Sequence, residues 1–192
     1  MEYHTAVRNI VERWRHLGSR TLENGTQLIG HVPHVAPEAW LHNLFAPLTK
    51  KEIGKVEKEL SCSLPDVFAE FLQIYNGLDL FSSTLSIYGL RKNYNRQGDD
   101  VWQPFSISDP NLYERPKDAK PSQLFIGGYN WDGSKLYLNM ETGEVIRCSK
   151  QSVRPLNHWS DFPCMLLSET ERIAKLFDES GREIRPDEPT IP

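Results

Sequence analysis

The chain has 192 residues, of which 39% are hydrophobic and 25% charged, with a formal net charge of −4. This composition is typical of one globular domain whose core needs neither disulfides nor metals for stability. The slight excess of acidic residues argues against nucleic acid as the main partner, because nucleic-acid-binding domains usually carry a basic surplus.

The N-terminal segment has the apolar spacing of an amphipathic helix over residues 2–17, which Gly18 would end. Its arginines and its lack of an apolar run argue against a signal peptide. No stretch of the chain is long and apolar enough to span a membrane. The sequence therefore predicts a cytoplasmic protein.

Residues 19–47 carry weaker signals. Asn24-Gly25 is typical of a tight hairpin turn. After prolines that interrupt any regular pattern, residues 38–45 are predicted to form one short helix because their apolar residues follow a helical spacing, at Trp40, Leu41, Leu44 and Phe45.

The signal becomes clear at Thr49. Thr49 and Glu52 are spaced as a capping box, which predicts the start of a helix. Pro65 is suited to the first turn of a second helix, and Gly77 is predicted to end that helix in a left-handed conformation.

The second half of the chain predicts mainly strands. Strands are expected over residues 84–90 and 123–126, with a long polar stretch at 91–122 between them. The clearest β signal is a hairpin over residues 135–148, where apolar and polar residues alternate. A closing helix is predicted at 161–179, capped by Ser160 or Asp161.

The expected order of elements is helices, then strands, then a final helix, with no βαβ alternation. This order predicts an α+β fold with a mostly antiparallel sheet. The expected organisation is an N-terminal helical extension (1–37), a main domain (38–180) and a mobile C-terminal tail (181–192).

Several motifs together resemble the SUKH superfamily, which comprises bacterial toxin-immunity proteins and fungal cell-wall regulators. Thr49 to Gly77, with Glu57 in the first helix and Leu64-Pro65 before the second, is similar to the opening of that domain. The later part is similar too. Its apolar strand is resembled by Phe125-Ile126-Gly127, its central hairpin by Asp132–Val145 and the start of its closing helix by Ser160-Asp161-Phe162. Three segments depart from the family pattern: the stretch before residue 38, the long 91–122 segment, and Phe162-Pro163-Cys164-Met165 in the last helix.

The resemblance implies a protein-binding domain without catalytic residues or cofactors. Its bacterial members are similar to immunity proteins that neutralise toxins, and its fungal members resemble regulatory scaffolds. We therefore expect an immunity protein that binds a cognate toxin directly. A regulatory scaffold is the alternative, and an enzyme or small-molecule binder of unrecognised type is a third hypothesis.

Catalytic and metal-binding patterns are weak. Pro33, between His31 and His34, prevents a helical zinc motif. His42 is near in sequence, but three histidines without supporting carboxylates make a weak metal site. The three cysteines, Cys62, Cys148 and Cys164, form no CxxC pair and are expected to be reduced and mostly buried, although a pairing of Cys148 or Cys164 with His158 is conceivable.

Two further patterns suggest ligands. Residues 128–135 resemble a phosphate loop, but a strand is expected after them where a helix would be needed. Aromatic and basic residues that could stack with single-stranded nucleic acid alternate before two aspartates, at Tyr88, Arg91, Lys92, Tyr94 and Arg96.

The partner-binding prediction rests on two loops that combine large aromatic residues with acids. Tyrosine and tryptophan are favoured interface anchors, and neighbouring carboxylates would attract a cationic partner. Packing of both tryptophans onto the core is an equally open alternative. The predicted binding residues are Asp99, Asp100, Trp102, Tyr129, Trp131 and Asp132.

Overall fold

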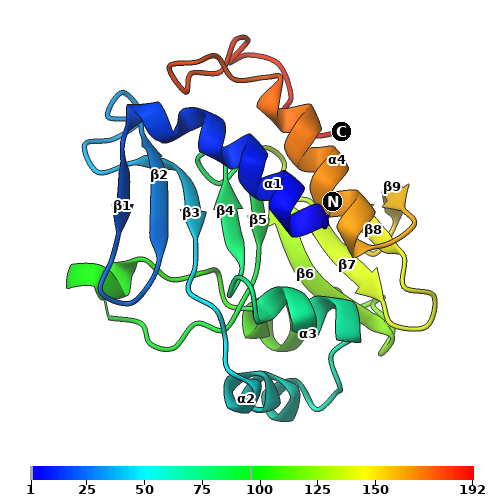
Figure 1. Ribbon diagram of the computed structural model, residues 1–192. Helices are drawn as coiled ribbons and strands as arrows, with labels where there is room; N and C mark the ends of the chain where they lie inside the picture. The colour runs from blue at the N-terminus through cyan, green and yellow to red at the C-terminus, as the bar shows by residue number, and fades with distance from the viewer. Residues whose placement is uncertain (1, 96) are drawn as a thin grey trace.

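A computed structural model describes residues 2–95 and 97–192. Its centre is one antiparallel sheet in which, over the described residues, nine strands follow one another in space in the order of the chain (Figure 1). The strands are β1 (Ser19–Thr21), β2 (Gln27–His31), β3 (Trp40–Leu44), β4 (Leu78–Leu80), β5 (Leu85–Ile87), β6 (Gln123–Tyr129), β7 (Lys135–Asn139), β8 (Val145–Cys148) and β9 (Pro155–Trp159).

Helices α1 (Tyr3–Val11) and α4 (Phe162–Ala174) pack side by side against one face of the sheet (Figure 1). A 3-10 helix (Glu12–Leu17) continues α1 and brings Trp14 against the sheet, where its ring contacts His42 and Phe81. The main hydrophobic core lies between these helices and the strands. The α+β prediction, with helices flanking a mostly antiparallel sheet, is confirmed.

Helices α2 (Lys50–Leu60) and α3 (Asp66–Leu72) lie beyond one end of the central strands (Figure 1). The predicted capping box is present, because Thr49 Oγ1 accepts from the Glu52 amide and the Glu52 carboxylate accepts from the Thr49 amide. Phe162 at the start of α4 packs edge-on against Phe68 and also contacts Phe71, which joins α3 to the core.

The prediction for residues 38–45 is wrong, since this segment forms β3 in place of a helix. Strand β3 pairs with β2 and β4 and has buried residues on both faces, so its apolar residues do not alternate. Gly77 has the expected left-handed backbone, with φ of 85°, but α3 already ends at Leu72. A side chain at Gly77 would collide with the Ile87 carbonyl.

The 135–148 hairpin is confirmed as β7 and β8, and the closing helix as α4, capped by Asp161. The predicted strand at 123–126 continues through Gly127-Gly128 to Tyr129. The connection from β5 to β6 contains a 3-10 helix (Gly98–Val101) and a π-helical turn (Asp109–Tyr113).

The C-terminal segment 181–192, for which the sequence predicts a mobile tail, makes defined contacts. The Ile184 amide donates to the Leu176 carbonyl, and Arg172 donates to the Thr190 carbonyl at 2.7 Å. Thr190 itself is buried. Together with the hydrogen bond that Arg147 donates to the Pro192 carbonyl, these contacts return the end of the chain to helix α4 and strand β8.

Candidate partner-binding site

Three of the predicted binding residues lie at or next to the turn between β6 and β7: Tyr129 is the last residue of β6, and Trp131 and Asp132 are in the turn. Asp132 accepts a hydrogen bond from the Ser134 amide at 2.9 Å, and Gly133 takes a left-handed backbone with φ of 67°. Trp131 is 44% exposed at the tip of this turn. A large aromatic side chain is therefore presented to solvent on a loop with a defined conformation.

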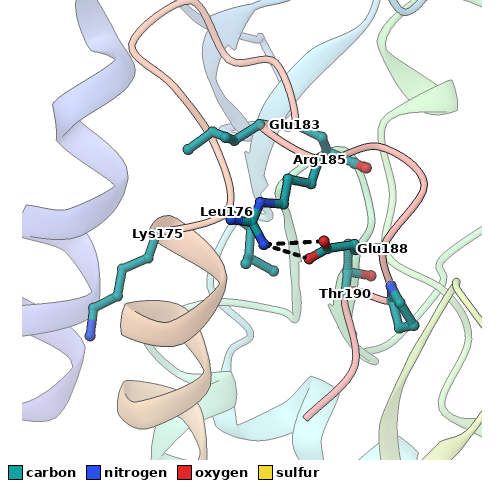
Figure 2. A pocket seen from close by; sticks show the side chains of 8 residues that line it. Lys175, Leu176, Glu183, Arg185, Glu188 and Thr190 are labelled. Carbon is teal, nitrogen blue, oxygen red and sulfur yellow. Dashed lines mark hydrogen bonds and ion pairs between the residues drawn. The ribbon is translucent and has the colours of Figure 1, made fainter.

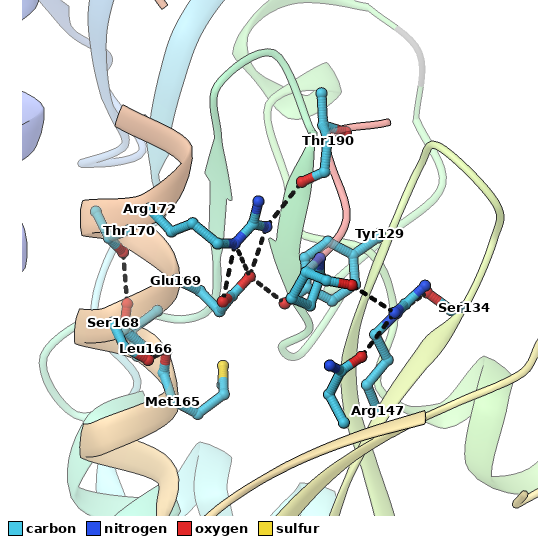
Figure 3. Close-up of polar contacts among 12 residues, drawn as sticks. Tyr129, Ser134, Arg147, Met165, Leu166, Ser168, Glu169, Thr170, Arg172 and Thr190 are labelled. Atoms are coloured by element: carbon cyan, nitrogen blue, oxygen red, sulfur yellow. Dashed lines mark hydrogen bonds and ion pairs between the residues drawn. The ribbon is translucent and has the colours of Figure 1, made fainter. Parts of the chain in front are cut away.

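Tyr129, in contrast, is buried, and Figure 3 shows it beside Glu169 of α4. Its hydroxyl donates to Glu169 Oε2 at 2.7 Å, and the same carboxylate accepts from Arg172. Burial, followed by the negative charge of Glu169, raises the pKa of Tyr129 well above its usual range. Tyr129 is thus a neutral hydrogen-bond donor that fixes the β6–β7 turn to α4.

Arg147 on β8 lies at the centre of a second group of polar contacts (Figure 3). Its guanidinium is 5.6 Å from the ring centre of Tyr129 and donates to Ser134 Oγ, Asp132 Oδ2 and Asn157 Oδ1 at 2.7 to 2.8 Å. Burial would raise the pKa of Asp132, but hydrogen bonds from Ser134 and Arg147 hold that pKa below its ordinary value. The Asp132 carboxylate already has a cationic partner inside the protein.

The other predicted residues lie against the first hairpin. The Asp99 carboxylate accepts from the Glu23 amide at 2.9 Å and lies 3.8 Å from Arg20. The Asp100 carboxylate accepts from the Asn95 side-chain amide at 3.0 Å. Trp102 is half-buried, and its carbonyl accepts from Asn24. These groups attach the β5–β6 connection to the β1–β2 turn.

The structure does not bring the two predicted loops together. Because adjacent strands alternate in direction, the β1–β2 turn and the β6–β7 turn lie at opposite ends of the sheet. Four strands, β2 to β5, also lie between β1 and β6. Asp99 and Trp131 therefore cannot belong to one small contact patch.

The β5–β6 connection is rich in exposed apolar side chains that the sequence reasoning did not select. Phe105 is 54% exposed and Tyr113 is 77% exposed. Phe105 packs edge-on against Tyr88, with ring centres 6.2 Å apart. Exposed aromatic residues on a segment fixed by such contacts are typical of protein interfaces. The exposed large apolar residues of this connection are Tyr94, Val101, Phe105, Leu112 and Tyr113.

An open cleft of about 700 Å³ lies beside these residues, on the sheet face opposite α1 and α4. The cleft reaches from Tyr88 past the β6–β7 turn to the loop that follows β8. Its charged lining residues come from three separate segments and include more than one lysine. They are Glu114, Arg115, Lys117, Asp118, Lys135 and Lys150.

A second pocket, of about 230 Å³, lies between the end of α4 and the C-terminal segment (Figure 2). Arg185 and Glu188 form an exposed ion pair of 3.1 Å within it, so that these charges compensate each other. Burial raises the pKa of Glu183 on its wall. The Thr190 hydroxyl on its wall is buried and has no hydrogen-bond partner among the described residues, but no cluster of like charges accompanies it.

The histidines and cysteines are dispersed. Within residues 2–95 and 97–192, no three histidine, cysteine or carboxylate side chains are grouped as a metal ion would require. His31 contacts the Pro37 carbonyl, and His158 pairs with Glu144 at 3.4 Å. All three cysteines are free; Cys148 is buried as expected, whereas Cys164 is exposed, contrary to the prediction.

The remaining sequence patterns also have structural explanations. Residues 128–135 lead into strand β7, as predicted, so they do not open a helix that could hold phosphate. Lys92 forms a 2.6 Å ion pair with Glu52, and Arg91 lies over the Tyr94 ring. Arg96 lies outside the described residues. No helix among the described residues has the length and apolar character needed to cross a membrane.

Residues 47–178 match the model of the SMI1/KNR4 family (SUKH-1), and no curated protein matches the chain. The match begins after β3 and ends beyond α4, so it contains the β6–β7 turn and the cleft but leaves β1–β3 outside. Members of this family are non-catalytic immunity or regulatory proteins that act through protein–protein interaction. Because the match spans more than half of its residues, the chain belongs to the SMI1/KNR4 (SUKH-1) family.

Proposed function

We propose that this chain is a non-enzymatic immunity protein that neutralises a cognate bacterial toxin in the cytoplasm by binding it directly. Family membership supports protein binding in general. The observation that supports a particular binding surface is the exposure of Trp131. This residue is 44% exposed on a turn that the contacts of Tyr129 and Asp132 hold in place.

An ordered aromatic anchor favours tight binding because little conformational entropy is lost when the partner docks. The Tyr129–Glu169 and Asp132–Arg147 contacts provide that order before any partner arrives. Of the predicted residues, we therefore assign direct contact to Trp131 and a supporting role to Tyr129 and Asp132. Asp99, Asp100 and Trp102 are proposed to form a separate, peripheral contact at the opposite end of the sheet.

The proposal can be tested by capture of the toxin-like product of a neighbouring gene, followed by calorimetric titration with the purified pair. We expect a one-to-one complex whose affinity falls at least about tenfold in Trp131→Ala, because truncation of an interface anchor typically costs more than 1 kcal/mol. Val35→Ala provides a matched control, since Val35 is also exposed on a turn, between β2 and β3.

The outcome separates this function from its alternative. Capture of a wall-synthesis or signalling protein in place of a toxin would identify the chain as a regulatory scaffold. Equal affinity of the Trp131→Ala and Val35→Ala proteins for the toxin would show that the β6–β7 turn is not the contact surface.

A further inference from the structure

The cleft on the face opposite α1 and α4 holds two lysines whose charges lie close together. Lys135 is buried on β7, and its ammonium donates to the Glu114 carbonyl at 2.8 Å. An ammonium has three donors, so this contact leaves two of them available. Burial and, to a smaller extent, the nearby charge of Lys150 lower the pKa of Lys135, whereas the charge of Glu114 opposes that change. An anion between these two lysines would relieve their repulsion.

Gly133 allows the second lysine to lie over the turn. A Cβ atom at this position would be 3.1 Å from Lys150 Cδ, so the absence of a side chain lets the Lys150 stem pack on the backbone. Lys117 lines the cleft from the opposite side and, among the described residues, has no ion pair.

Tyr88 adds an uncommitted hydroxyl group to the same cleft. No hydrogen bond joins that hydroxyl to another described residue, although most of the ring is buried. The hydroxyl lies beside Gly128, where a Cβ atom would approach it to 2.8 Å. Two glycines thus keep open the space around a phenol and the neighbouring lysines, and a phenol can donate to a carboxylate.

Two acidic side chains that line the cleft, Glu114 and Asp118, limit which anionic ligands can bind there. The Asp118 carboxylate is engaged by Ser152 Oγ at 2.7 Å and by the Val153 amide, whereas Glu114 has an exposed side chain. A nucleic-acid backbone would bring continuous negative charge past both acids. A protein segment can instead place one carboxylate between the lysines and an apolar side chain on exposed Phe105, which packs against Tyr88.

From this arrangement we infer that the cleft is a docking site for an acidic segment of a protein partner. One carboxylate of that segment is held by Lys135, Lys150 and the Tyr88 hydroxyl, and a neighbouring apolar side chain packs on Phe105. The inference rests on the proposed function and deepens it, because it adds a positively charged contact area beside the Trp131 turn and defines the chemistry of the partner.

The test uses the full chain and a fluorescein-labelled peptide rich in aspartate and glutamate, with a central phenylalanine, at low and high salt. We expect saturable binding that weakens with salt, and NMR shifts of backbone amides at Tyr88 and Ser134. Lys117→Glu combined with Lys150→Glu should weaken binding about tenfold. Lys55→Glu with Lys58→Glu makes the same charge change on exposed positions of α2 and should leave binding unaltered.

Tyr88→Phe tests the hydroxyl separately, because it retains the ring that packs on Phe105. It should weaken peptide binding about tenfold to hundredfold, the usual effect of losing one hydrogen bond to a charged group. Thermal unfolding of every variant confirms that the fold is intact before binding is compared.

Three results would overturn the inference: no peptide binding, equal binding by both charge-reversed proteins, or tighter binding of a single-stranded oligonucleotide than of the peptide. The proposed function is judged independently by the toxin complex. If Trp131→Ala weakens that complex and Lys117→Glu/Lys150→Glu does not, the immunity function stands and the acidic-segment site is wrong.

Discussion

The Tyr129 hydroxyl donates a 2.7 Å hydrogen bond to the buried carboxylate of Glu169, forty residues further along the chain. This contact joins the loop that presents Trp131 to the helix that closes the fold. Loop order and the stability of α4 therefore depend on the same pair of atoms.

Removal of the hydroxyl in Tyr129→Phe should lower the free energy of unfolding by about 1–3 kcal/mol, because Glu169 loses one buried partner while retaining Arg172. Urea denaturation measures the change. Tyr113→Phe is the control, since Tyr113 is 77% exposed and should change stability very little. Equal stability of the two variants would contradict the structural role of the Tyr129 hydroxyl.

His42 is expected to make the fold sensitive to acid. The imidazole is buried between Trp14 and Phe81, and burial lowers its pKa from 6.5 to about 3. The unfolded chain then binds a proton that the folded chain excludes, so stability present above pH 6.5 is lost as the pH falls toward 3. The contribution of His42 has a slope of about 1.4 kcal/mol per pH unit. His42→Gln should remove it, as denaturation across this pH range would show.

Asp79 is expected to contribute a slope of opposite sign. Its carboxylate is buried beside Ser86, which donates to it at 2.7 Å, and burial raises its pKa from 3.8 to about 6. The folded chain holds the proton more tightly, so this contribution is complete below pH 3.8 and is lost as the pH rises through 6. Between these values the effects of His42 and Asp79 largely cancel.

Asp79→Asn should consequently raise stability at neutral pH by on the order of 1–3 kcal/mol, because a buried charge is removed. In this variant the acid sensitivity due to His42 should extend over the whole range from pH 6.5 to pH 4. Asp187→Asn is the exposed control. A loss of stability at neutral pH would mean that the hydrogen bonds to the Asp79 carboxylate outweigh the cost of burying its charge.

Deletion of residues 189–192 should destabilise the protein by about 1–3 kcal/mol, although these residues contain no regular secondary structure. The deletion removes the carbonyl groups of Thr190 and Pro192, which accept from Arg172 and Arg147 respectively. Hydrogen exchange should accelerate in α4 and β8. Arg185→Ala, which breaks only an exposed ion pair, should stay within about 0.5 kcal/mol of the parent protein.

The parts of the fold that the sequence predicted well are those governed by local chemistry. The capping box at Thr49 and the alternating hairpin at residues 135–148 each depend on neighbours within a few residues. Strand β3 was misread because Leu41 and Leu44 fit a helical spacing equally well, and only pairing with β2 and β4 decides between the two. The prediction included no strands for β4 and β9, which are three and five residues long.

The candidate site was predictable only in part, for a related reason. An aromatic and acidic turn at Tyr129–Asp132 is visible in sequence, but its partners Arg147 and Glu169 are contributed by distant elements. The sequence could not show that the carboxylates of Asp99 and Asp132 are already engaged within the fold. It also could not bring Lys117, Lys135 and Lys150 into one cleft, since they come from separate segments.

The order of the strands in the sheet determines where such a domain can gain additional strands. Strands β1–β3 lie before the residues that match the family. Because each strand pairs with its neighbours in the chain, they extend the sheet from β4 without changing how the other strands are connected. The added strands cover the side of β4 that would otherwise be a free edge, and the new edge is the short, exposed β1. A meander can thus acquire new surface at one margin while the pairing of the strands from β4 to β9 stays the same.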